Sequence, residues 1–171
     1  MLSILFVNFC MCMSQIQNTH YVNDEYKYSI DFPENWIIES REEMYHVISC
    51  QTPDTSRVKK GSIKIIIQNV GDENNFDLIV EKMTNPIKTF IAKDFTDIEK
   101  GKIIINGIEF YLYDYSYNYK SKDLPERQRN FNCYYLNNGK IYCLMFWGDE
   151  LYFDNNKDLI MKSIESFKFL D

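Results

Sequence analysis

The stretch Ile103-Ile104-Ile105-Asn106-Gly107-Ile108 is the strongest folding signal in the sequence. An Asn-Gly pair between β-branched residues is typical of a two-residue type I′ turn, because both central positions of that turn need a positive φ. We therefore predict a tight β-hairpin here, with a return strand from Ile108 to about Tyr119. A second hairpin is expected downstream, with strands over 129–136 and 140–147 joined by Asn137-Asn138-Gly139.

Further strands and two helices are expected around these hairpins. Alternating or β-branched segments predict strands at 26–32, 36–39, 45–51, 62–70 and 167–169. Apolar residues recur at helical spacing over 76–91 and over about 155–166, which predicts two amphipathic helices, the second capped by Asp154. Pro86 lacks the N–H that an interior helical turn needs, so it should kink the first helix or begin a second one.

The order of these elements favours one class of fold. Strand hairpins with helices segregated among them predict an α+β fold, in which a mostly antiparallel β-sheet is flanked by helices, rather than a parallel α/β fold. The chain has 171 residues, of which 45% are hydrophobic and 16% aromatic, so it can bury the core of a single domain.

The opening of the predicted domain resembles a known family. Tyr28-Ser29-Ile30-Asp31-Phe32-Pro33-Glu34-Asn35-Trp36 is similar to the first strand and turn of PsbP-like domains, a family that also covers DcrB-type and other exported bacterial proteins. The end of the chain resembles it too, with an Asn-Gly-Lys hairpin, an aromatic strand, a helix and then Ile164-Glu165-Ser166-Phe167-Lys168-Phe169. The resemblance spans Tyr26 to Leu170. It implies an α/β/α sandwich and a binding, assembly or chaperone-like role, and it carries no catalytic residues over.

A short apolar leader precedes this domain. Residues 2–13 are almost wholly apolar, too short for a bilayer span of about 20 residues but as long as the apolar core of a signal peptide. We expect a signal peptide over 1–14, a flexible N-terminal segment over 15–25 and a single PsbP-like domain over 26–171. No Lys or Arg precedes Lys27, so a buried N-terminal strand is the alternative. A lipid anchor on Cys10 or Cys12 also stays open, although neither follows a good lipobox.

Charge and composition limit the partners. The formal net charge of -6 weighs against nucleic acid, because phosphate binding needs a concentrated basic surface. We predict an exported protein, periplasmic, envelope-associated or secreted, without a transmembrane span, that binds a protein or envelope component and is not an enzyme. Two alternatives stay open: a periplasmic immunity or inhibitor-type protein, and a hydrolase that acts through an unrecognised acidic pair.

Catalytic and cofactor motifs are not found in the sequence. It has no Gly-x-Ser-x-Gly element, no phosphate-binding loop and no Cys or His spacing typical of zinc, so we assign no catalytic residue, cofactor or metal. His46 and Cys50 share a face of one predicted strand, but about 13 Å of strand rise separates them. The acidic positions Asp149, Glu150 and Asp154 are better explained by helix capping and solvation than by calcium.

Five tyrosines share one face of the strand that follows the first hairpin: Tyr111, Tyr113, Tyr115, Tyr117 and Tyr119. One interpretation is that they pack under a helix with their hydroxyls at the rim. The other is a partly exposed aromatic platform that binds a partner or a sugar.

The pairing of Cys133 with Cys143 depends on the second turn. A three-residue loop at 137–139 would place the two cysteines opposite each other, close enough for a cross-strand disulfide. A two-residue turn would place them on opposite faces of the hairpin, as buried thiols. Cys50 is unpaired in either case.

Overall fold

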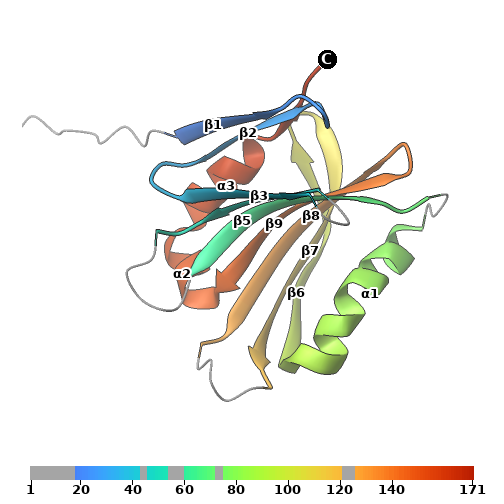
Figure 1. Ribbon diagram of the computed structural model, residues 1–171. Coiled ribbons are helices and arrows are strands. Elements are labelled where there is room, and N and C mark those ends of the chain that lie inside the picture. The colour runs from blue at the N-terminus through green and yellow to red at the C-terminus, as the bar shows by residue number, and fades with distance from the viewer. Residues whose placement is uncertain (1–17, 43–45, 54–59, 72–74, 121–125) are drawn as a thin grey trace, which may run out of the picture.

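The computed structural model describes residues 18–42, 46–53, 60–71, 75–120 and 126–171. Within these ranges, a seven-stranded sheet has the order β3-β4-β5-β9-β8-β7-β6, and each neighbouring pair is antiparallel (Figure 1). The bounds of its strands are β3 Ile37–Glu42, β4 His46–Gln51, β5 Gly61–Asn69, β6 Ala92–Ile105, β7 Ile108–Tyr119, β8 Gln128–Asn137 and β9 Lys140–Asp149. A small sheet of order β1-β2-β10 is formed by β1 Asn18–Asn23, β2 Tyr28–Pro33 and β10 Lys168–Phe169.

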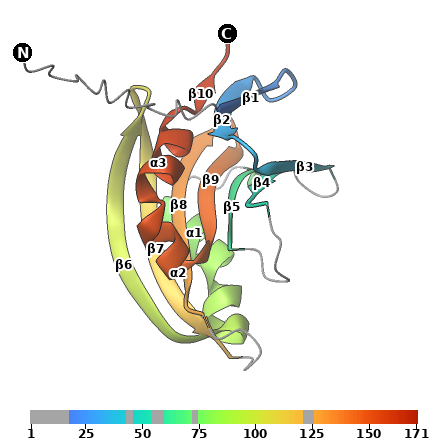
Figure 2. The same cartoon turned by 90° about the vertical axis from the view of Figure 1, so that its left-hand side faces the viewer.

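Helices cover both faces of the main sheet. In Figure 2, α2 (Glu150–Asn155) and α3 (Lys157–Glu165) lie in front of the sheet, and α1 (Phe76–Pro86) lies behind it. A π-helical turn, η1 (Ile87–Ile91), continues α1 and leads into β6. The α+β fold and the antiparallel sheet flanked by helices are therefore confirmed.

The two faces of the sheet bury two separate clusters, because successive side chains of a strand point to opposite faces. We call the side covered by α2, α3 and the small sheet the closed face; its cluster includes Phe32, Ile65, Phe110, Leu112, Phe131, Leu144, Phe146, Phe153, Ile160 and Ile164. We call the side covered by α1 the tyrosine face; its cluster includes Ile79, Val80, Ala92, Tyr113, Tyr115, Tyr117, Tyr134, Ile141 and Cys143.

The helices differ in detail from the sequence prediction. At Pro86 the first helix ends and a second helical segment begins, as one of the two expectations had it, but this segment is the short π-helical turn η1, with Pro86 as its N-cap. The C-terminal helix begins earlier than expected and is interrupted at Asn156. Its N-cap is Asp149, whose Oδ1 accepts the Tyr152 N–H at 2.6 Å, so Asp154 is not the cap.

Residues 18–23 correct the expectation of a flexible segment over 15–25. They form β1, which pairs antiparallel with β2. Packing of Tyr21 accounts for this strand: its ring lies 6.1 Å from both the Tyr28 and the Phe32 rings and packs against the cluster of the closed face. The other residues of β1 are mostly polar, so the composition of this segment did not indicate a strand. The rest of that segment up to residue 17, and the predicted signal peptide, lie outside the described residues.

Both predicted hairpins form, and the turn of the second one determines which residues lie opposite Cys133 and Cys143. Asn106 and Gly107 have φ of 47° and 80°, and Asn138 and Gly139 have φ of 50° and 70°. The second turn is therefore a two-residue turn, with Asn137 opposite Lys140.

Of the two alternatives for Cys133 and Cys143, the structure therefore has the buried thiols and not the cross-strand disulfide. The register sets Cys133 opposite Leu144 and Cys143 opposite Tyr134, so the thiols point to opposite faces of the sheet. Both cysteines are free and buried, as is Cys50. Burial raises the pKa of the Cys143 thiol to about 12 and raises that of Cys133 as well. A thiol that stays protonated is a poor nucleophile, so these cysteines fill the core.

Candidate functional site

The tyrosine face is mostly interior. Tyr113, Tyr115 and Tyr117 are buried under α1 and β6, whereas Tyr111 and Tyr119 are half-buried. Phe95 of β6 stacks on Tyr115 with ring centroids 4.9 Å apart, and its ring is nearly parallel to that of Tyr117. The rings thus pack as a core layer, and a platform of five exposed rings is not formed. The face leaves a pocket accessible at Tyr111 and Tyr113.

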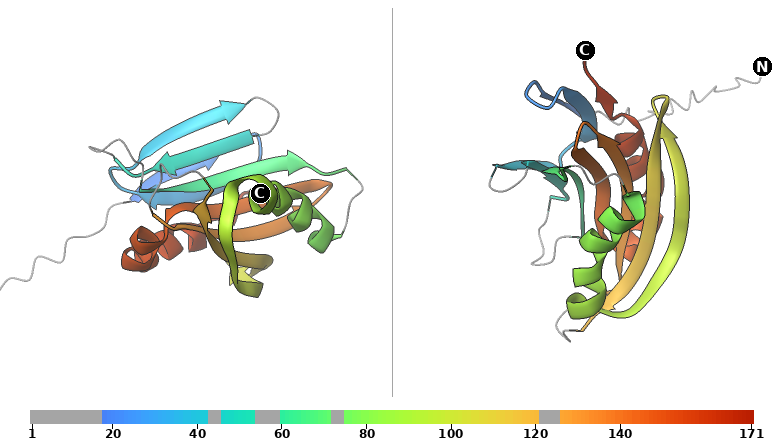
Figure 3. Two further views of the ribbon diagram at one scale, coloured as in Figure 1. Left: turned by 90° about the horizontal axis from the view of Figure 1, so that it is seen from below. Right: turned by 90° about the vertical axis from the view of Figure 1, so that its right-hand side faces the viewer.

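Strand β6 shapes this pocket by bending over the tyrosines. Its register against β7 shifts between Lys93 and Thr96 and again between Asp97 and Glu99, and such bulges curve a strand. Asp94 adopts a positive φ of 52° at the first bulge. Arg127 holds this bend: its guanidinium donates to the Asp94 carbonyl oxygen at 3.1 Å and to Thr96 Oγ1 at 2.7 Å. Figure 3 shows the curved β6 beside α1.

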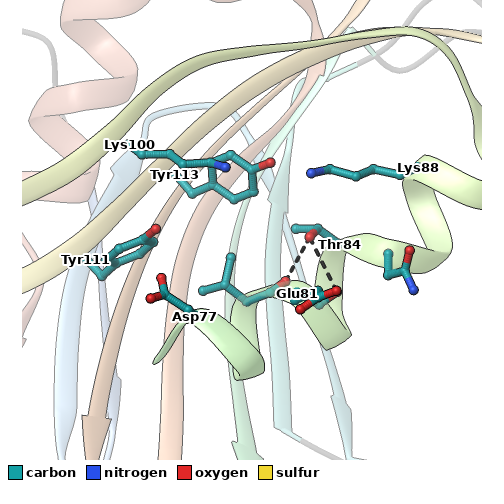
Figure 4. A pocket seen from close by; sticks show the side chains of 9 residues that line it. Asp77, Glu81, Thr84, Lys88, Lys100, Tyr111 and Tyr113 are labelled. Atoms are coloured by element: carbon teal, nitrogen blue, oxygen red, sulfur yellow. Dashed lines mark hydrogen bonds between the residues drawn. The ribbon is translucent and has the colours of Figure 1, made fainter. Parts of the chain in front are cut away.

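The pocket lies between α1 and strands β6 and β7 and has a volume of about 310 Å³ (Figure 4). Its principal lining side chains are Asp77 and Glu81 of α1, Lys88 of η1, Lys100 of β6, and Tyr111 and Tyr113 of β7. The sequence pattern singled out only the two tyrosines among these.

One end of the pocket is basic. Tyr113 donates its hydroxyl to Asp97 Oδ1 at 2.5 Å, and the Nζ atoms of Lys100 and Lys88 lie 3.6 and 4.0 Å from the Asp97 carboxylate. The hydrogen bond from Tyr113, with the two lysines, lowers the pKa of Asp97, so this carboxylate is ionised at neutral pH. Burial, together with the hydrogen bond to Asp97, raises the pKa of Tyr113, which keeps its hydroxyl a donor.

The other end is acidic. Asp77 and Glu81 lie four residues apart on one face of α1, and Asp77 points toward Tyr111 in Figure 4. Burial is the main cause that raises the pKa of Tyr111, and the negative charges of Asp77 and Asp97 add to it. Thr84 lines the pocket without offering its hydroxyl hydrogen, which it donates to the Val80 carbonyl oxygen at 2.8 Å.

Groups with catalytic potential elsewhere are engaged in structural contacts. His46 is buried, with Nε2 2.8 Å from the Tyr28 hydroxyl, and its ring stacks on Tyr26. Asp114 accepts two hydrogen bonds from Arg129, at 2.8 and 2.6 Å. Burial raises the pKa of Asp114, and the guanidinium opposes this rise.

The acidic positions considered for calcium also have structural partners. Glu150 pairs with Arg127 at 3.3 Å, and Asp154 pairs with Arg129 at 3.4 Å. Within the described ranges, no cluster of three or more His, Cys, Asp and Glu side chains is suited to a metal ion. No helix in the described part of the chain has the length and apolar character needed to cross a membrane.

Comparison with solved structures defines the class of fold. Cyanobacterial PsbP (CyanoP) from Synechocystis sp. PCC 6803 is 13% identical, with a TM-score of 0.62 over 94% of this chain and 96% of that chain. LpqN of Mycobacterium tuberculosis is 15% identical, with a TM-score of 0.59 over 92% of both chains. The Ran-binding protein Mog1p of Saccharomyces cerevisiae is 12% identical, with a TM-score of 0.59 over 91% of this chain and 97% of that chain.

The chain therefore has a PsbP-like fold, as its opening and closing segments indicated. At these identities the likeness establishes the fold and no residue of a site. No family model matches the sequence, and no curated protein is significantly similar to it.

Proposed function

We propose that the protein is an exported, non-catalytic binding protein that engages a protein partner through the tyrosine face. The observation that carries the proposal is the half-open pocket between α1 and strands β6 and β7, lined by charged side chains around Tyr111 and Tyr113. A concave site with a few convergent polar groups is the usual form of a binding site.

Exposed apolar side chains near the pocket support a protein partner. Phe90, in the turn that joins α1 to β6, is 77% exposed, and Ile98 at the second bulge of β6 is exposed as well. Large aromatic side chains are enriched at protein interfaces and often anchor them. The fold is compatible with such a role, because a protein of this fold, Mog1p, is described as Ran-binding.

Site-specific cross-linking in the native cell tests the partner. A photoreactive phenylalanine analogue at Phe90 is expected to yield one discrete adduct with a second protein. The matched control is the same analogue at Leu151 of α2, which is 68% exposed but lies on the other side of the sheet. Equal adducts from both positions, or none from Phe90, would contradict the proposal.

Export is tested separately, by the intact mass of the protein from its native envelope fraction. We expect loss of the first 14 residues. A full-length protein confined to the cytoplasmic fraction would overturn the export part and leave the binding part standing.

A further inference from the structure

We propose that the pocket binds a segment of the partner that presents one carboxylate and one ammonium or guanidinium group. This inference rests on the proposed function, which supplies a protein partner, and it adds the chemistry of the segment. Two lysines share one aspartate at one end of the pocket, whereas two carboxylates line the other end.

The basic end has donors to spare. Lys88 and Lys100 lie 4.0 and 3.6 Å from Asp97, beyond the usual length of an N–H···O hydrogen bond of about 2.7–3.2 Å. Among the described residues, no other carboxylate lies within ion-pair distance of either lysine. Each ammonium has three N–H donors, so a ligand carboxylate between them could accept from both.

Aromatic rings hold these lysines in place. Lys100 Nζ lies 4.6 Å from the centroid of the Tyr113 ring, and Lys88 Nζ lies 4.7 Å from that of Phe95. Figure 4 shows both ammonium groups directed toward Tyr113 from opposite sides. Cation–π contacts of this kind limit the motion of long side chains, so less ordering is needed when an anion binds.

The acidic end suits a cation. Asp77 and Glu81 repel each other across one turn of α1, and within the described residues neither forms an ion pair. The ring of Tyr111 lies beside Asp77 in Figure 4 and stacks on Phe76, with centroids 6.0 Å apart. Carboxylates next to an aromatic face are the partners that ammonium and guanidinium groups prefer.

The spacing of the two ends points to a short peptide. Glu81 in α1 and Lys88 in η1 are seven residues apart, which corresponds to a backbone rise of about 10 Å along the helical axis. An extended chain covers about 10 Å in three residues. The volume of about 310 Å³ is at the small end for binding pockets, so a few residues would fill it. A simple anion or cation would leave one end unpaired.

Peptide titration followed by NMR of the ¹⁵N-labelled protein tests this inference. The probe is the capped peptide acetyl-Glu-Ala-Ala-Lys-amide, compared with versions in which Gln replaces either charged residue. We expect the parent peptide to shift the amide signals of Lys88, Lys100 and Tyr113, and each neutralised peptide to bind about tenfold more weakly. The double variant Lys88→Gln/Lys100→Gln should lose about as much affinity for the parent peptide.

The matched control is Lys102→Gln, which removes a lysine from the same strand but outside the pocket, where it pairs with Glu109 at 2.7 Å. Its affinity should change less than about twofold. No shift with the parent peptide, or equal losses of affinity in the control and the double variant, would overturn the inference. If the Phe90 cross-link persists unchanged in the double variant, this inference fails and the proposed function stands; if no cross-link forms at all, the proposed function fails.

Discussion

The two faces of the main sheet hold similar charged groups in opposite settings. On the closed face, Arg129 donates to both oxygens of Asp114, whose side chain is only 3% exposed. On the tyrosine face, Asp97 is 49% exposed, and the two lysines lie 3.6 and 4.0 Å away. In the Asp114–Arg129 pair, both carboxylate oxygens accept a hydrogen bond and little of either side chain reaches water, so this pair serves the fold. In the cluster of Asp97, Lys88 and Lys100, the ion-pair distances are long and the side chains are partly exposed, so the lysine N–H donors remain open to a ligand.

The largest expected effect is the loss of the sealed pair. Asp114→Ala leaves the Arg129 charge in a site that is 14% exposed, where its guanidinium also lies over the Phe153 ring at 4.7 Å. We expect a loss of about 3–5 kcal/mol in the free energy of unfolding, measured by urea denaturation. The control is Asp114→Leu/Arg129→Met, which removes both charges and should recover most of that loss. A loss below about 1 kcal/mol for the single variant would mean that water or the Asp154 carboxylate, 3.4 Å from Arg129, compensates the remaining charge, and that Asp114 is not essential to the fold.

A smaller effect is expected at the hydroxyl that connects the buried tyrosine layer to the open cluster. Tyr113→Phe removes the hydrogen bond to Asp97 and should lower the free energy of unfolding by about 1 kcal/mol at neutral pH. The same change should raise the pKa of Asp97 toward its ordinary value, because that bond is the largest cause of its depression.

The difference in stability between wild type and Tyr113→Phe should depend on pH, because it involves the titration of Asp97. A carboxyl whose pKa is lower in the folded than in the unfolded state adds stability above the unfolded value of 3.8, and this contribution is lost as the pH falls through the folded value. The difference between wild type and Tyr113→Phe should therefore shrink below about pH 4. Carbon-detected NMR titration of the Asp97 carboxyl gives the pKa directly. Identical titration curves would show that the Tyr113 bond does not form in solution.

The closed face was largely predictable from sequence, whereas the open cluster was not. Alternating apolar residues and the Asn106-Gly107 pair specify strands and a turn by local chemistry, and they identified most of the main sheet. Strand β6 differs, because most of its side chains are exposed and its two bulges disturb the period of two. The sequence pattern therefore did not indicate Asp97 and Lys100 as site residues, since a polar edge strand resembles a loop in composition.

The second hairpin shows a different limit. Asn137-Asn138-Gly139 is compatible with a two-residue and a three-residue turn, and local residue preferences favour neither strongly. The sheet decides between them, because a shift of one residue would move Ile141 and Leu144 to the wrong faces. The sequence left the disulfide and the buried thiols open for this reason: the choice depends on a register that only the complete sheet determines.

The smallest expected effect on stability is at Lys88 and Lys100 of the pocket. Its size distinguishes lysines that serve binding from lysines that serve the fold. In Lys88→Gln/Lys100→Gln, both replaced side chains are partly exposed and their distances to Asp97 are long, so the free energy of unfolding should change by less than about 0.5 kcal/mol in urea. The same variant is expected to lose peptide affinity about tenfold. A loss of stability above about 1.5 kcal/mol would instead mean that the lysines hold η1 and β6 together over the tyrosines, because their cation–π contacts to Tyr113 and Phe95 would then be worth more than exposed contacts usually are. In that case both charge clusters would serve the fold, and the tyrosine face would keep no ammonium groups available for a ligand.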